Sequence, residues 1–191
     1  MRDRITLWGL IVLAFIAVGC NTGATSSAGS SAGPASGGLL PSLAIPSVSF
    51  STDPALAAML PETLCGTAAV KTSFAGETFG SSTDAEFLAF VQALGKTPAD
   101  VSFAAAIGGT TGCTASIMRV KGADTAQLRD KFTAEMVKEG NTTQEKTLGG
   151  KTVLVGSDAN SFGYVYFKDD TVIIFTAPDE AKATEIATAL P

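Results

Sequence analysis

The residues with the most reactive side chains are three cysteines, Cys20, Cys65 and Cys113. The chain has no histidine, which excludes Ser-His-Asp and Cys-His catalysis, the HExxH zinc motif and proton transfer through imidazole. No two cysteines are spaced as CxxC, so thioredoxin-like exchange is not expected. The chemical question for each thiol is therefore what it is bonded to.

The sequence before Cys20 has the features of an export signal. It begins with Arg2 and Arg4 and continues with an apolar run from Ile5 to Val18 that is interrupted only by Thr6 and Gly9. A helix that spans a membrane needs about 20 apolar residues. The run is shorter than that and ends in small residues, so we predict that residues 1–19 are a signal peptide.

The small residues Ala17 and Gly19 followed by Cys20 resemble the lipobox of bacterial lipoproteins. The resemblance implies cleavage before Cys20, a thioether from its sulfur to diacylglycerol, and an acyl chain such as palmitate on the new amino terminus. It covers only the first twenty residues. The alternatives are ordinary signal cleavage after Gly19, a free Cys20 thiol inside an uncleaved anchor, and an intermolecular disulfide.

Cys65 and Cys113 are expected to form one disulfide bond. Disulfides persist in exported proteins, and an odd thiol there needs an explanation. If Cys20 carries lipid, the other two cysteines form a pair that bridges two neighbouring strands. Closing a loop of 48 residues stabilises a fold by about 4 kcal/mol in the chain-entropy model. The alternative is a pair of buried, reduced thiols.

Other motifs have ordinary structural explanations. The stretch GGTTGC at 108–113 lacks the Lys-Ser/Thr of a phosphate loop and predicts a turn. Asp169 and Asp170 are adjacent carboxylates that a calcium ion can contact, but such a pair at the tip of a hairpin is usually only a solvated turn. We therefore expect no catalytic residues, no metal and no cofactor, and we expect that the protein is not an enzyme.

The segment after Cys20 is expected to be a tether. Residues 21–38 contain no charged, aromatic or large aliphatic side chain, so they bury too little apolar area to offset their backbone entropy. We assign residues 20–52 to the lipidated cysteine and a disordered Gly/Ser/Ala/Pro tether, and residues 53–191 to a folded domain. Without residues 1–19 the chain has 11 basic and 17 acidic side chains, formally −6. This charge argues against binding to nucleic acid.

The folded segment alternates between helical and strand patterns. We expect first a helix that starts at Asp53-Pro54, a strand over 63–74, and a helix over 83–94 with a Thr83/Glu86 capping box. A hairpin over 101–120 follows, with its turn at 108–112, and then a helix capped by Asp124 that carries Leu128, Phe132 and Met136. The last elements are two short strands joined at Gly149-Gly150, a hairpin over 162–177, and a helix that starts at Pro178-Asp179-Glu180. Because tight hairpins join the strands, we predict a single α+β domain, mainly an antiparallel sheet with helices packed on it.

Part of this order occurs twice. The stretch ETLCGTAAV at 62–70 resembles KTLGGKTVL at 146–154, and each is followed by a hairpin and then a helix. This similarity suggests an internal duplication that builds one pseudo-symmetric sheet. The alternative is coincidence, since any α+β chain repeats such elements.

One strand invites a functional hypothesis. Phe162, Tyr164 and Tyr166 share one face of their strand, while Val165 and Phe167 share the other. Two apolar faces need two covers, and either the domain itself or a ligand or partner provides the second. Cover by the domain's own elements is the default interpretation, and the three aromatic residues are our candidate binding face if that cover is missing.

These observations predict a non-enzymatic lipoprotein on the extracytoplasmic face of a bacterial membrane, at the cell surface. We expect its folded domain to bind or scaffold an unidentified protein or apolar ligand. The alternative is a carrier or chaperone for an apolar ligand such as a lipid, held between sheet and helices. A hydrolase that uses only carboxylates is a weaker third possibility.

Overall fold

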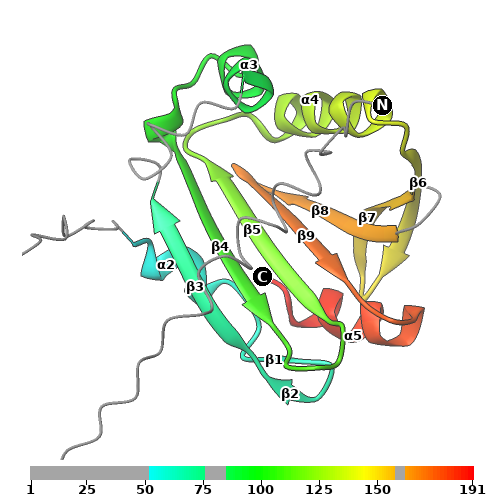
Figure 1. The fold of residues 1–191 in the computed structure, drawn as a ribbon. Coiled ribbons are helices and arrows are strands. Elements are labelled where there is room, and N and C mark those ends of the chain that lie inside the picture. Colours follow the sequence, from blue (N-terminus) through cyan, green and yellow to red (C-terminus); the bar gives the residue numbers. More distant parts are fainter. Residues whose placement is uncertain (1–51, 76–84, 158–161) are drawn as a thin grey trace, which may run out of the picture. The chain divides into compact units, whose positions relative to one another are not determined.

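Helices and antiparallel strands alternate through the folded part of the chain (Figure 1). The computed structural model describes residues 52–75, 85–157 and 162–191, within a compact unit of residues 50–191. The helices are α2 (Pro54–Ala58), α3 (Ala85–Ala93), the short 3-10 helix η2 (Pro98–Asp100), α4 (Thr125–Lys138) and α5 (Glu180–Ala189). The strands are β1 (Thr63–Leu64), β2 (Thr67–Ala68), β3 (Val70–Ala75), β4 (Val101–Ile107), β5 (Thr114–Val120), β6 (Thr142–Leu148), β7 (Lys151–Ser157), β8 (Phe162–Lys168) and β9 (Thr171–Thr176).

Seven of the strands form one sheet in the order β3-β4-β5-β9-β8-β7-β6, and β1 and β2 form a separate two-stranded sheet. Every neighbouring pair is antiparallel. The two outer strands, β3 and β6, lie at opposite sides of the sheet in Figure 1. The predicted fold class, an α+β domain with helices packed on an antiparallel sheet, is confirmed.

Helices α2 and α5 cover one face of the sheet. Leu56 of α2 and Ile186 of α5 belong to one buried cluster with side chains of the central strands, including Ile117, Ile173 and Phe175. Ile117 and Ile173 lie opposite each other in the pairing of β5 with β9, so they point to the same face. We call this side the α2/α5 face.

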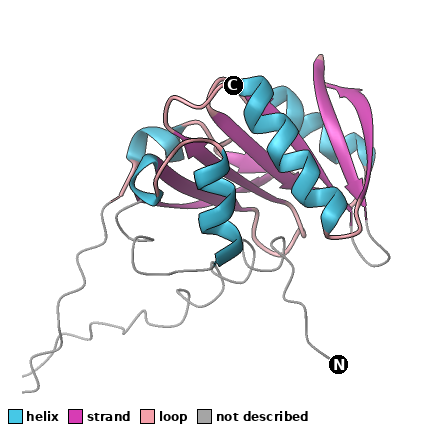
Figure 2. Ribbon diagram, turned by 90° about the horizontal axis from the view of Figure 1, so that it is seen from above, coloured by secondary structure: helices cyan, strands magenta, loops and turns pink. Residues whose placement is uncertain are grey.

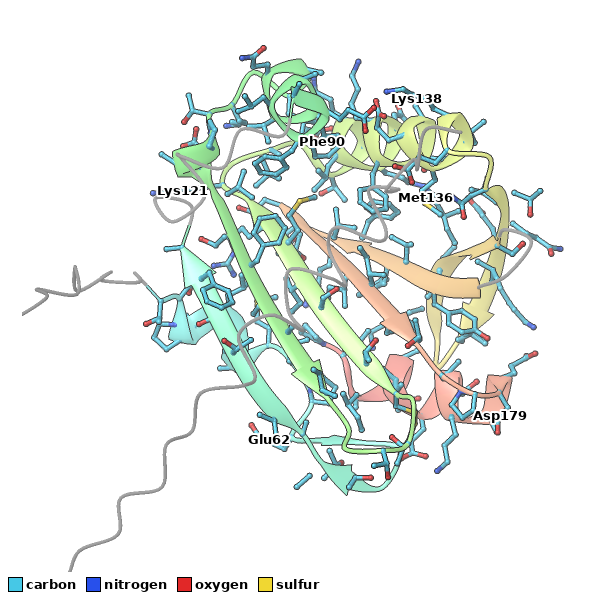
Figure 3. The ribbon with its side chains drawn as sticks, viewed as in Figure 1. Glu62, Phe90, Lys121, Met136, Lys138 and Asp179 are labelled. Carbon is cyan, nitrogen blue, oxygen red and sulfur yellow. A yellow bond between two sulfur atoms is a disulfide. The ribbon has the colours of Figure 1, made fainter. Side chains whose placement is uncertain are left out.

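Helices α3 and α4 cover the other face, as Figures 2 and 3 show. Phe90 and Met136 point from these helices towards the strands in Figure 3, and both are buried. The Phe132 ring lies edge-on to the Phe90 ring and to the Phe167 ring of β8, with ring centroids 6.3 and 5.9 Å apart. We call this side the α3/α4 face. Among the described residues, no helix is long and apolar enough to cross a membrane.

The sequence predicted the starts of α2, α4 and α5 correctly because their capping residues act locally. The side chains of Asp53, Asp124 and Asp179 each accept a hydrogen bond from the backbone N–H three residues later, at 3.0, 2.9 and 2.8 Å. Gly95 follows α3 with φ of 68°, the left-handed backbone typical of a helix end. Thr83, the predicted partner of Glu86 in a capping box, lies outside the described residues.

The prediction of one strand over 63–74 is wrong. The chain reverses inside this stretch, where Leu64 pairs with Thr67 across a turn formed by Cys65 and Gly66. Both turn residues have positive φ, 52° and 80°, the backbone that a two-residue type I′ hairpin turn requires. The stretch therefore forms β1, β2 and β3 instead of one strand.

The second copy of the repeated sequence has the same local geometry. Leu148 pairs with Lys151 across the turn Gly149-Gly150, whose φ angles are 57° and 79°. The repeat pairs Leu148 with Leu64, and both leucines are buried. Each copy also precedes a hairpin and then a helix: β4, β5 and α4 in the first half, where α3 and η2 intervene before the hairpin, and β8, β9 and α5 in the second. These matches support the hypothesis of an internal duplication.

Candidate functional site

The structure contains the Cys65–Cys113 disulfide that the sequence predicts, with the two Cα atoms 6.2 Å apart. This separation is within the usual range for a disulfide. Cys65 lies in the turn between β1 and β2 and is partly buried, whereas Cys113 is buried directly before β5. The prediction that the bond bridges two neighbouring strands is therefore corrected: the bond joins a hairpin turn to the loop between β4 and β5.

The candidate aromatic face contributes to the domain's own core. Tyr164 is 5% exposed and stacks on Phe175 of β9, with ring centroids 5.1 Å apart. Tyr166, on the same face, is partly buried against the same cluster, and the Lys151 ammonium lies 5.9 Å from its ring centroid. The side chain of Phe162 lies outside the described residues. The burial of Tyr164 favours core packing over ligand contact for this part of the face.

Burial also affects the acidity of Tyr164. Desolvation raises the pKa of its phenol, an effect that the positive charge of Lys146 partly offsets and that the negative charge of Glu180 reinforces. The phenol is therefore neutral at ordinary pH and is a poor proton acceptor. This chemistry suits a buried ring that stacks on Phe175 more than a general base.

The two aspartates at the β8–β9 turn have structural roles, Asp169 through its backbone and Asp170 through its carboxylate. Asp169 has φ of 51°, a left-handed backbone that aspartate tolerates better than most residues. Asp170 Oδ2 accepts a hydrogen bond from Gly122 N at 3.0 Å, and its Oδ1 lies 3.6 Å from Arg119 Nε. Within residues 52–75, 85–157 and 162–191, no group of three or more Cys, Asp or Glu side chains is placed to hold a metal ion.

The sequence did not identify Arg119 as an important residue. Its guanidinium lies between two carboxylates, 3.7 Å from Asp53 Oδ2 and 3.6 Å from Asp170 Oδ1, and it donates to Met59 Sδ at 3.2 Å. Asp53 caps α2 and Asp170 is in the β8–β9 turn. Arg119 therefore ties α2 to a distant turn. These partners lie far apart in the sequence, so no local sequence pattern predicts the contact.

The most exposed apolar surface of the described residues lies beside the outer strand β3. Val70 is 75% exposed and Ile107 is 43% exposed, and they lie directly opposite each other in the pairing of β3 with β4. Thr72, two residues further along β3 on the same side of the sheet, is also exposed. We call Val70, Thr72 and Ile107, with the unpaired backbone of β3, the β3 edge. The sequence predicted Val70 only as a strand residue.

No protein family model, no curated protein and no solved structure matches this chain. Its candidate sites therefore rest on its own geometry. Of these, the β3 edge is the surface best suited to contact another molecule, because it combines exposed apolar side chains with backbone groups that can pair.

Proposed function

We propose that the protein is a lipid-anchored domain on the extracytoplasmic side of a bacterial membrane, where it binds or scaffolds a partner without catalysing a reaction. The observation that carries this proposal is the pairing of Cys65 with Cys113. It leaves Cys20 as the one cysteine without a disulfide partner in its own chain. Its position directly after a signal-like segment suits attachment of lipid.

The domain's chemistry supports a binding role. Many of its described carboxylates have structural roles: they cap helices, as Asp124 and Asp179 do, or form ion pairs, as Asp170 does with Arg119. Buried side chains from both helix pairs line the described interfaces with the sheet. A carrier of apolar ligands needs a cavity there, and no observation in the described residues favours one.

The proposal is tested by expressing the full chain and its Cys20→Ser variant in a bacterial host. We expect the wild-type chain to fractionate with membranes, to require detergent for extraction, and to have the mass of residues 20–191 plus diacylglycerol and acyl groups. We expect Cys20→Ser to lose the lipid mass and leave the membrane fraction. The Cys65→Ser/Cys113→Ser double variant is the matched control and keeps its lipid. An unmodified Cys20 in soluble wild-type protein would contradict the proposal.

A further inference from the structure

We propose that the β3 edge is a self-association surface, at which two copies of the chain pair their β3 strands antiparallel to form a dimer with one continuous sheet. This inference goes beyond the lipid-anchored function and does not depend on it. In the part of the chain that the structure describes, no strand pairs with the outer side of β3. An edge strand of this kind presents a row of backbone donors and acceptors that another strand can satisfy.

The two outer strands of the sheet differ in how they oppose such pairing. Strand β6 carries Glu145, which pairs with Arg129, and Lys146, which pairs with Glu180. Charged side chains on an edge strand discourage another strand from adding there. Strand β3 carries one charge, that of Lys71. Its Nζ donates to Glu62 Oε1 and to the Leu60 carbonyl oxygen, each at 2.7 Å. The β3 edge therefore lacks the protection that β6 has.

The neutrality of the β3 edge favours a second copy of this chain as the occupant. The whole chain has a formal charge of −5, so most of its surface repels a copy of itself. Beside β3, however, the exposed residues of α2 are Pro54, Ala55 and Ala58, which are small and uncharged. In an antiparallel dimer the two α2 helices would lie on the same side of the joined sheet. On β3 itself the one charge, that of Lys71, is paired with Glu62, so little unpaired charge separates two copies at this edge.

The sequence of β3 also selects one register. In such a dimer the twofold axis is perpendicular to the sheet. Residues that lie opposite each other point to the same face of the sheet only when the axis passes between one residue and the same residue of the other copy. An axis at Lys71 would place two lysines opposite each other, which is unfavourable. An axis at Thr72 places Lys71 opposite the partner copy's Ser73 and the exposed Val70 opposite its Phe74, which is partly buried here. Pairs of an aromatic and a β-branched residue stabilise antiparallel strands. Of these two registers, we therefore expect the one centred on Thr72.

The first test is the mass of the detergent-solubilised full chain by sedimentation equilibrium, from low concentration up to about 1 mM. We expect a monomer–dimer equilibrium in the wild-type protein. Val70→Lys places a charge at the interface and should weaken the dimer by at least about tenfold. Because Val70 is 75% exposed, this change should leave the fold intact. Val137→Lys is the matched control: Val137 is 55% exposed on α4, away from β3, and its variant should dimerise like the wild type.

The second test examines the register. Thr72→Cys brings two cysteines face to face at the axis, so oxidation should give a covalent dimer on a non-reducing gel. Gln144→Cys, an exposed position on β6, is its control and should stay monomeric. A wild-type chain that is monomeric up to the highest concentration would overturn the proposal. So would a Val70→Lys dimer as stable as the wild-type dimer, or equal cross-linking of the two cysteine variants.

Discussion

The two copies of the repeated hairpin turn have nearly the same backbone but are attached to the domain in different ways. Cys65 has φ of 52° and Gly149 has φ of 57° at equivalent positions. The side chain of Cys65 forms the bond to Cys113. At Gly149 a Cβ atom would lie 2.7 Å from the backbone nitrogen of Thr188 in α5, so a helix occupies that space. One turn is held by a covalent bond and the other by close packing.

The difference continues into the strands beside each turn. After its turn, β7 pairs with β6 over seven residue pairs, from Leu148 and Lys151 to Thr142 and Ser157. The β1–β2 ladder has two pairs and ends at Thr63 and Ala68. Pro61, which precedes β1, has no N–H to donate to a ladder. The first copy thus leaves β3 as an outer strand, whereas the second copy adds β6 to the sheet.

The largest expected effect tests the covalent attachment. Replacing both cysteines, in Cys65→Ala/Cys113→Ala, should lower the free energy of unfolding by about 4 kcal/mol, because the unfolded chain gains the freedom of an open loop of 48 residues. Urea unfolding measured by circular dichroism gives this value. Adding a reductant to the wild-type protein is the control and should reproduce most of the loss. Equal midpoints for oxidised and reduced protein would contradict the role of the bond.

The close packing of the second turn is tested by Gly149→Ala. The new methyl group meets the Thr188 backbone, and alanine also resists a φ of 57°, so we expect a loss of about 3 kcal/mol. Gly150→Ala is the matched control. Its φ is 79°, but no atom lies within 4 Å of the added Cβ, so it should cost about 1 kcal/mol. Equal losses from the two variants would show that the contact with α5 is unimportant.

A third change gives the first turn a glycine at residue 65, the residue type that the second turn has at the equivalent position 149. In the absence of the disulfide, Cys65→Gly/Cys113→Ala should be more stable than Cys65→Ala/Cys113→Ala by about 1 kcal/mol, because glycine adopts the left-handed backbone without steric cost. The same urea experiment measures the difference. If the alanine version is as stable, then the backbone at residue 65 relaxes once the bond to Cys113 is removed.

Local rules predicted most of the fold. The three aspartate caps and the helix of Leu128, Phe132 and Met136 depend on residues a few positions apart, and all are found as expected. The turn at Cys65-Gly66 was missed because cysteine seldom adopts positive φ and the surrounding residues suit a continuous strand. The repeat contained the missing signal, since it aligns Gly66 with Gly150, in a stretch that was correctly predicted to turn.

The candidate surfaces were less predictable because they depend on strand order. The exposure of Val70 follows from the outer position of β3, and no short stretch of sequence specifies which strand is outermost. Likewise, Tyr164 is buried because it points to the α2/α5 face, where α5 packs on the sheet. Alternation placed the tyrosines correctly on one face but did not show what covers that face.

The smallest expected effects come from replacing two lysines, Lys71 of β3 and Lys146 of β6. Lys71 has a side chain that is 16% exposed and donates to the Leu60 carbonyl as well as to Glu62, so Lys71→Ala should cost about 1 kcal/mol. Lys146 forms its ion pair with Glu180 in solvent, with 42% of its side chain exposed, and Lys146→Ala should cost about 0.3 kcal/mol.

Salt separates the two contributions. In about 1 M NaCl the effect of Lys146→Ala should disappear, because the Debye length is only about 3 Å there. Most of the effect of Lys71→Ala should remain, since a carbonyl oxygen accepts one of its hydrogen bonds beneath α2. Lys71→Met keeps the apolar stem and serves as the control for lost packing. If the two alanine variants lost equal stability and responded equally to salt, Lys71 of β3 would be no better integrated than Lys146 of β6. The contrast between the two copies would then be confined to the turns at Cys65 and Gly149.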